Sequence, residues 1–176
     1  VVTDITEPTE LAASIASQLD LTCFDSNDGQ FEVGAYGGTP PYTFDIGSGS
    51  QPTGVFDNLL PNTYTVTIED ANFCQTAIDV TISEPAPLVI DAGNDVTICN
   101  GDVIGLNVSG AVSYSWTPAQ VLTDPNISNP DFNGSATTTL TVTGTDADGC
   151  IATDDVTVTV NPLPVVDAGS DEVICT

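Results

Sequence analysis

Apolar and polar residues alternate along several short stretches of this 176-residue chain. In residues 63–68 the side chains of Tyr64, Val66 and Ile68 alternate with threonines, and residues 139–143 repeat the pattern. A period of two is typical of a β-strand with one buried face. Clusters of glycine, proline, serine and asparagine separate these stretches at the spacing of short antiparallel strands. The pattern predicts an all-β fold.

The pattern recurs after a fixed interval of 76 residues. The cysteines show the interval directly, because it separates Cys23 from Cys99, Cys99 from Cys175, and Cys74 from Cys150. In the same register, residues 63–74 align with residues 139–150 without a gap. Self-similarity at a constant period is the signature of tandem structural repeats. The sequence therefore predicts two tandem modules.

The repeat also predicts the domain boundaries. Residues 4–8 resemble residues 81–85, the end of a module, and we therefore interpret residues 1–8 as the end of a preceding copy. The two modules are predicted over residues 9–86 and 87–163, and residues 164–176 as the first strand of a following copy. The sequence is thus interpreted as part of a longer array. Residues 10–18 are the only stretch with a helix-like pattern, but their alignment with residues 88–95 predicts a first strand.

Each module of about 76 residues has room for roughly seven short strands, which is typical of an immunoglobulin-like β-sandwich. Trp116 is predicted to fill the core of the second module, and residues 42–44 to be its counterpart in the first. The alternative is that Trp116, with Tyr114 and Tyr36, contacts a ligand such as a sugar. Both interpretations remain open at the level of sequence.

The charge of the chain excludes several classes of function. There is no lysine, arginine or histidine, and the net charge is −25. Nucleic acids and anionic lipids are bound through lysine and arginine, so no nucleic-acid partner is expected. Most serine and cysteine nucleophiles need a histidine or lysine base, so the protein is predicted not to be an enzyme. No apolar run approaches the roughly 20 residues of a membrane span, so no direct membrane insertion is expected.

Residues 144–150 (GTDADGC) raise the question of a metal site. An aspartate-rich run resembles the start of a calcium loop, but no glutamate follows to close one, so an EF-hand is excluded. A hairpin turn before Cys150 is the favoured interpretation, since aspartate, asparagine and glycine suit tight turns. Calcium is the one candidate cofactor, because a divalent cation would relieve the repulsion among the acids. The candidate ligands are Asp91, Asn94, Asp95, Asp146 and Asp148.

The cysteines are predicted to be disulfide-bonded within modules. Each module has one cysteine after its first strand and one after the hairpin turn, which pairs Cys23 with Cys74 and Cys99 with Cys150. Cys175 then bonds a residue outside this sequence. Such a bond is expected to contribute about 4 kcal/mol by restricting the unfolded chain. Disulfides imply an oxidising compartment, so the predicted location is extracellular, at the cell surface.

The first module contains three characteristic motifs: Leu21-Thr22-Cys23, Gly37-Gly38-Thr39-Pro40-Pro41-Tyr42 and Asp70-Ala71-Asn72-Phe73-Cys74. In these motifs it resembles the SprB-type repeat of giant gliding-motility adhesins of Bacteroidota. The second module, with Tyr114-Ser115-Trp116, is similar to the PKD or immunoglobulin-like modules of the same surface proteins. Phe73 departs from the family, which usually has glycine before the cysteine.

The resemblance implies a long chain, secreted by the type IX system, that acts as an adhesin, stalk or filament on the outer cell surface. We therefore predict a structural and adhesive segment of a surface fibre in adhesion or gliding motility. Its expected partners are neighbouring modules of the same chain, identical chains in a fibre, and surface glycans or proteins. The alternatives are a module that binds a glycan or protein, and a subunit of a multi-chain homopolymeric filament.

Overall fold

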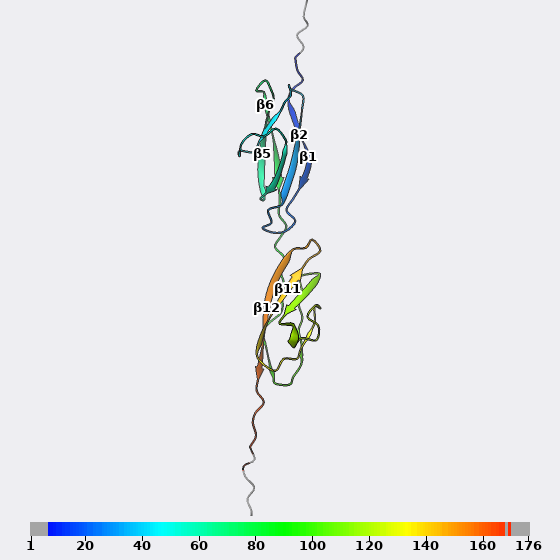
Figure 1. Cartoon of the computed structure of the whole chain (residues 1–176), viewed down its shortest axis with the longest axis vertical. Helices are drawn as coiled ribbons and strands as arrows, with labels where there is room; N and C mark the ends of the chain where they lie inside the picture. Colours follow the sequence, from blue (N-terminus) through cyan, green and yellow to red (C-terminus); the bar gives the residue numbers. More distant parts are fainter. Residues whose placement is uncertain (1–6, 168, 170–176) are drawn as a thin grey trace, which may run out of the picture. The chain divides into compact units, whose positions relative to one another are not determined.

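The chain folds into two compact units, Val1–Pro87 and Leu88–Thr176. The computed structural model describes residues 7–167 and residue 169, and Figure 1 shows both units. The division between the units lies one residue from the boundary predicted by the repeat. Most of the residues assigned to flanking modules, and Cys175 with them, lie outside the described residues.

Unit 1 contains two three-stranded sheets. One sheet has the order β1-β2-β4, formed by Ala12–Leu19, Gly29–Tyr36 and Val55–Leu59. The other has the order β3-β5-β6, formed by Thr43–Asp45, Asn62–Glu69 and Gln75–Ile82. All of these pairings are antiparallel. A single hydrophobic cluster joins the two sheets, with Phe31 and Val33 from β2 and Val66 and Ile68 from β5 at its centre.

Unit 2 has a four-stranded and a two-stranded sheet. The larger sheet has the order β7-β12-β11-β9, formed by Val96–Cys99, Ile151–Asn161, Thr138–Thr145 and Ser113–Thr117. The smaller one pairs β8 (Ile104–Gly105) with β10 (Asp131–Phe132). A short 3₁₀ turn, η1, covers Ala119–Val121. Among the described residues, no helix is long and apolar enough to cross a membrane.

The predicted alternation is confirmed in both units. In β5, Val66 and Ile68 are fully buried. Thr63 and Thr65, on the opposite face of the same strand, are exposed. The equivalent strand of unit 2 buries Leu140 and Val142, and β12 buries Val156 and Val158. The predicted fold class, an all-β chain of immunoglobulin-like sandwich modules, is therefore confirmed. The acids do not oppose this folding, because every described acid except Asp70 lies outside the two cores, in turns and loops or on strand positions that are not buried.

The first strand behaves differently in the two units. Residues 10–18 are mostly strand, as predicted, and β1 pairs along its whole length with β2. The aligned residues 88–95 form only one isolated bridge, between Asp91 and Ser109, and regular pairing starts at Val96. The cause is a kink at Gly93, whose φ of +80° is unfavourable for other residues. The kink redirects the chain so that β7 runs parallel to β12.

The last strand of each sandwich runs from one end of the sandwich to the other, so its two ends serve to name the ends of the unit. In unit 1, β6 follows the hairpin turn of residues 70–74 and ends beside Leu21, whose N–H donates to the Ser83 carbonyl at 3.0 Å. We call the end with residues 70–74 the hairpin pole, and the end with residues 20–26 and 83–84 the exit pole. Eight strand residues separate the poles by about 25 Å. In unit 2 the hairpin pole holds residues 146–150 and the exit pole holds residues 99–102 and 161.

The chain enters each unit at its hairpin pole. In unit 1, the Thr9 carbonyl accepts a hydrogen bond from Gly38 N–H at 2.7 Å, next to the hairpin. In unit 2, Ala92 N–H donates to Asp154 Oδ2 at 2.8 Å, a few residues into β12. Because the last strand then runs to the exit pole, each unit receives the chain at one end and releases it at the other.

Candidate functional site

One buried carboxylate builds the hairpin turn of unit 1. Asp70 is 5% exposed, and its Oδ1 accepts hydrogen bonds from the N–H groups of Asn72 at 2.8 Å and Cys74 at 2.9 Å. Its Oδ2 accepts one from Thr39 N–H at 2.8 Å. These donors hold the pKa of Asp70 below its ordinary value, because they stabilise the ionised form. The hydrogen bond from Thr39 N–H has the largest effect.

The equivalent turn of unit 2 repeats this arrangement. Asp146 Oδ1 accepts from Asp148 N–H at 3.0 Å and from Cys150 N–H at 2.8 Å. Asp146 N–H also donates to the Cys150 carbonyl at 3.0 Å, as Asp70 N–H does to Cys74. The predicted hairpin turn before Cys150 is therefore confirmed. The aspartates there organise the backbone, and that role requires no metal.

The candidate calcium ligands of the first segment serve the backbone too. Asp91 Oδ1 accepts from Gly93 N–H at 2.9 Å, and Asp95 Oδ1 accepts from Thr157 N–H at 2.8 Å. Asn94, between them, is exposed. Within the described part of the chain, no group of three or more histidine, cysteine, aspartate or glutamate side chains is placed to hold a metal ion. A calcium site at Asp91, Asn94 and Asp95, or at Asp146 and Asp148, stays a prediction.

Trp116 belongs to the core of unit 2. It is 1% exposed, and its indole Nε1 donates to the Ile127 carbonyl at 3.0 Å. The predicted core role is confirmed, and the alternative of a ring that stacks on a ligand is wrong for this residue. Tyr114 is half-buried, with its hydroxyl donating to the Ala111 carbonyl at 2.7 Å. Tyr36, at 57% exposed, is the only one of the three candidates with an open ring.

The predicted pairing of the cysteines within modules is wrong. Cys74 and Cys99 are exposed free thiols, whereas Cys23 and Cys150 are disulfide-bonded. The reason is distance. Cys23 lies at the exit pole of unit 1, where Asp25 N–H donates to Glu84 Oε2 at 3.3 Å, and Cys74 lies about 25 Å away at the hairpin pole. A disulfide requires Cα atoms within about 7 Å.

The same separation holds in unit 2. Cys99 is the register partner of Asn161, the last residue of β12, and Cys150 immediately precedes the first. The 11 residues of β12 place the two cysteines about 35 Å apart. Each module thus carries one cysteine at each pole, and neither pair can close within its own module.

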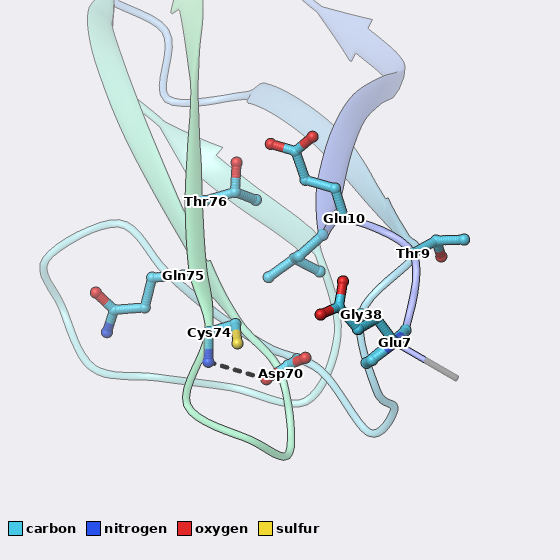
Figure 2. A pocket seen from close by; sticks show the side chains of 10 residues that line it. Glu7, Thr9, Glu10, Gly38, Asp70, Cys74, Gln75 and Thr76 are labelled. Carbon is cyan, nitrogen blue, oxygen red and sulfur yellow. Dashed lines mark hydrogen bonds between the residues drawn. The ribbon is translucent and has the colours of Figure 1, made fainter. Parts of the chain in front are cut away.

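A pocket of about 400 Å³ opens at the hairpin pole of unit 1. It lies between the hairpin, which contributes Asp70 and Cys74, and the incoming segment, which contributes Glu10 and Leu11 (Figure 2). Gly38 forms part of its wall, and an added Cβ there would lie 2.7 Å from Asp70 Oδ2. The pocket therefore combines a free thiol, an apolar side chain and carboxylates.

Sequence reasoning missed this pocket and the separation of the poles. The spacing of Asp70 from Cys74 is the sequence signal for a carboxylate that accepts from the backbone of the turn. The eight residues between Cys74 and Ser83 give the length of the sandwich, about 25 Å, and this length keeps Cys74 and Cys23 apart.

The fold and the cysteine arrangement together define a tandem immunoglobulin-like sandwich repeat with one cysteine at each pole of each module. The family model of the SprB repeat matches residues 15–51, within unit 1, and thereby confirms the predicted resemblance of that unit. No curated protein matches the chain by sequence.

Solved structures of adhesion and surface-layer proteins are similar to the chain. The N-terminal eight immunoglobulin domains of Down Syndrome Cell Adhesion Molecule match with 12% identity and a TM-score of 0.51, over 87% of this chain and 24% of that one. Domains 4 and 5 of the S-layer protein SbsC match with 14% identity and a TM-score of 0.37, over 88% of this chain and 99% of that one. At these identities the likeness of the first structure supports the immunoglobulin-like fold.

Proposed function

We propose that the chain is a structural and adhesive segment of a long extracellular repeat protein. In this proposal successive sandwich modules form a cell-surface stalk, fibre or filament that acts in adhesion or gliding motility. The SprB repeat match in unit 1 supports an adhesion-type surface module. Export by the type IX system, and the absence of enzymatic activity, belong to the same proposal.

The observation that carries the proposal is the polarity of each module. The chain enters at the hairpin pole and leaves at the exit pole, about 25 Å away in unit 1. Modules connected in this way extend an array with every copy, whereas modules that enter and leave at one pole fold back on each other. The short proline-containing connector at residues 84–87 favours an extended joint.

A ligand-binding role receives less support, because the core position of Trp116 removes the aromatic side chain on which that alternative mainly depended. Tyr36, at 57% exposed, is the candidate contact that this alternative retains for a glycan or protein. A multi-chain filament would use the unpaired edges of the sheets, such as the outer edge of β1. Electron microscopy of the native surface fibre distinguishes a single-stranded fibre from a multi-chain one.

Small-angle X-ray scattering of the chain tests the extended arrangement. A compact globule of 176 residues would have a radius of gyration of about 16 Å. Two units of about 12 Å each, with centres separated by roughly the length of β12, should exceed about 20 Å. A measured value near 16 Å would contradict the proposal.

A further inference from the structure

The turn before Cys74 in unit 1 holds an aromatic side chain in an unfavourable backbone conformation. Phe73 adopts φ = +64°, in the left-handed region where the Cβ of any residue other than glycine is crowded. The turn itself does not require phenylalanine, because unit 2 builds the same turn with Gly149 at φ = +88°. In both turns the N–H of this residue donates to the carbonyl of the first aspartate, at 3.0 Å for Phe73 and 3.4 Å for Gly149. Backbone strain that the fold does not need points to a function of the strained residue.

The ring of Phe73 makes little contact with the unit that carries it. It is 81% exposed, the highest value among the large apolar side chains described in unit 1. The ring does not line the pocket at the hairpin pole, although the next residue, Cys74, does. Exposed aromatic side chains on rigid elements are typical anchors of protein interfaces. Phe73 therefore has the properties of an anchor that enters a cavity on a partner.

The pocket beside Phe73 is a cavity of suitable size for such an anchor. Cys74 and Gly38 lie on its wall (Figure 2), together with the apolar side chain of Leu11. Gly38 leaves it open, because a Cβ there would lie 3.2 Å from Leu11 Cδ1 and 2.7 Å from Asp70 Oδ2. Its volume of about 400 Å³ is within the range of ligand pockets, about 300–1,000 Å³, and leaves room for an aromatic ring. One pole of unit 1 thus carries both an exposed ring and a cavity for a ring.

The surface around the ring is uncharged, although the chain as a whole carries a net charge of −25. Residues 71–75 and 37–42 contain no aspartate or glutamate, and Asp70 beside them is 5% exposed. The two segments are in contact, since Ala71 N–H donates to the Thr39 carbonyl at 2.9 Å. Two copies of so acidic a chain repel each other, and an uncharged patch is where they approach at least electrostatic cost.

We propose that the hairpin pole of unit 1 joins two copies of the chain. The Phe73 ring of each copy enters the pocket of the other. A two-fold axis relates the copies, because an exposed ring and a cavity on the same surface satisfy each other in both directions only in that arrangement. The partner is therefore a second copy of this chain. The inference depends on unit 1 by itself and not on the adhesive role proposed above.

The acids on the far wall of the pocket predict how the dimer responds to salt. Glu7 and Glu10 line the pocket from the incoming segment, and both are exposed. In the dimer their charges face the acids of the second copy, so repulsion opposes the apolar contact. Salt shortens the range of such repulsion, from about 10 Å at 0.1 M to about 3 Å at 1 M. The dimer should therefore become tighter as salt is added, the reverse of an association through ion pairs.

Sedimentation equilibrium of the full chain, kept free of oxidant, tests the association. The mass should rise from 18.1 kDa toward twice that value with concentration. Phe73→Gly keeps the turn, as Gly149 shows, and should weaken the dimer at least about 30-fold by removing its central aromatic side chain. Phe24→Ala is the matched control, because that ring is 44% exposed at the opposite pole and should leave the dissociation constant unchanged. A wild-type chain that is monomeric at about 1 mM, or an undiminished dimer in Phe73→Gly, would overturn the proposal.

A mixture of two variants tests whether the contact is reciprocal. Thr76→Asp places a charge on the pocket wall and keeps the ring, whereas Phe73→Gly keeps the pocket and removes the ring. Each variant alone should be mostly monomeric, and the mixture should form a heterodimer with one ring in one intact pocket. A mixture that associates no more than its components would contradict the two-fold arrangement. Scattering of the monomeric Phe73→Gly chain tests the extended arrangement separately.

The thiol of Cys74 reports on the geometry of the dimer. Cys74 follows Phe73 and lines the pocket, so the two-fold axis brings the Cys74 thiols of both copies together. In a chain with Cys99 and Cys175 changed to serine, oxidised glutathione should link two copies through Cys74. The two sulfurs join, and their two protons and two electrons reduce the glutathione disulfide to two thiols. Phe73→Gly should slow this link at least about tenfold, and equal rates in both chains would refute the inference.

Discussion

Replacing Trp116 is the sharpest test of how the second module is stabilised. The residue is 1% exposed, and its indole N–H donates to the Ile127 carbonyl. Trp116→Phe keeps an aromatic ring but loses this hydrogen bond, which costs about 1 kcal/mol because Ile127 is partly exposed to water. The smaller ring leaves a void that costs about 1–2 kcal/mol more.

These costs are large for a module of this size. A unit of about 76 residues has a stability of roughly 4–11 kcal/mol. A loss of about 2–3 kcal/mol should lower the unfolding midpoint of unit 2 by about 10–20 °C. Trp116→Ala should cost about 3–5 kcal/mol or more, close to the whole stability of the unit.

Differential scanning calorimetry measures the effect, and the transition of unit 1 provides an internal reference. Trp116 is the only tryptophan, so its fluorescence follows the unfolding of unit 2 alone in the wild-type chain. Tyr36→Ala is the control, because a mostly exposed ring should change stability by less than about 0.5 kcal/mol. A Trp116→Ala chain that unfolds like wild type but loses glycan binding would refute the core assignment and restore a ligand-binding role.

Two further predictions concern the hairpin poles. Phe73 adopts φ = +64° where the second module has Gly149 at +88°, so Phe73→Gly should raise the midpoint of unit 1 by a few degrees and Gly149→Phe should lower that of unit 2. Calorimetry showing no gain for Phe73→Gly would contradict this account of backbone strain. Backbone N–H donors, of which Thr39 N–H has the largest effect, lower the pKa of Asp70 in the folded chain. The ionised carboxylate therefore stabilises the fold at neutral pH, and this contribution is lost as the pH falls through the lowered pKa. The midpoint of Asp70→Asn should therefore lie several degrees below wild type at pH 7, with the gap closing below pH 3.8, and a gap independent of pH would contradict it.

The fold was largely predictable because its signals are local. Alternation fixed the buried faces of β5 and β11, and the aspartate-rich run before Cys150 identified the hairpin between β11 and β12. The details of the sheets were less accessible, since a kink at Gly93 changes the partner of the first strand in unit 2. Such a change depends on tertiary pairing, which the aligned residues 10–18 and 88–95 do not reveal.

The cysteine pairing failed for a different reason. Two cysteines per module suggested one bond per module, but the number of cysteines says nothing about the distance between them. A sandwich has a length, and the strand between Cys74 and Ser83 is about 25 Å long. The repeat period does not reveal this separation, since it shifts every cysteine by the same 76 residues. Only the position of each cysteine along the sandwich shows that the two cysteines of a module lie too far apart to bond.

The charge of the chain limits how one module can be held against another. A chain with a net charge of −25 and no basic residue has no ion pairs with which to hold one module against the next. Like charges at a junction repel, and salt screens but does not reverse the repulsion. Any contact between such modules must therefore rest on apolar packing, uncharged hydrogen bonds or a bound cation, and not on ion pairs between side chains.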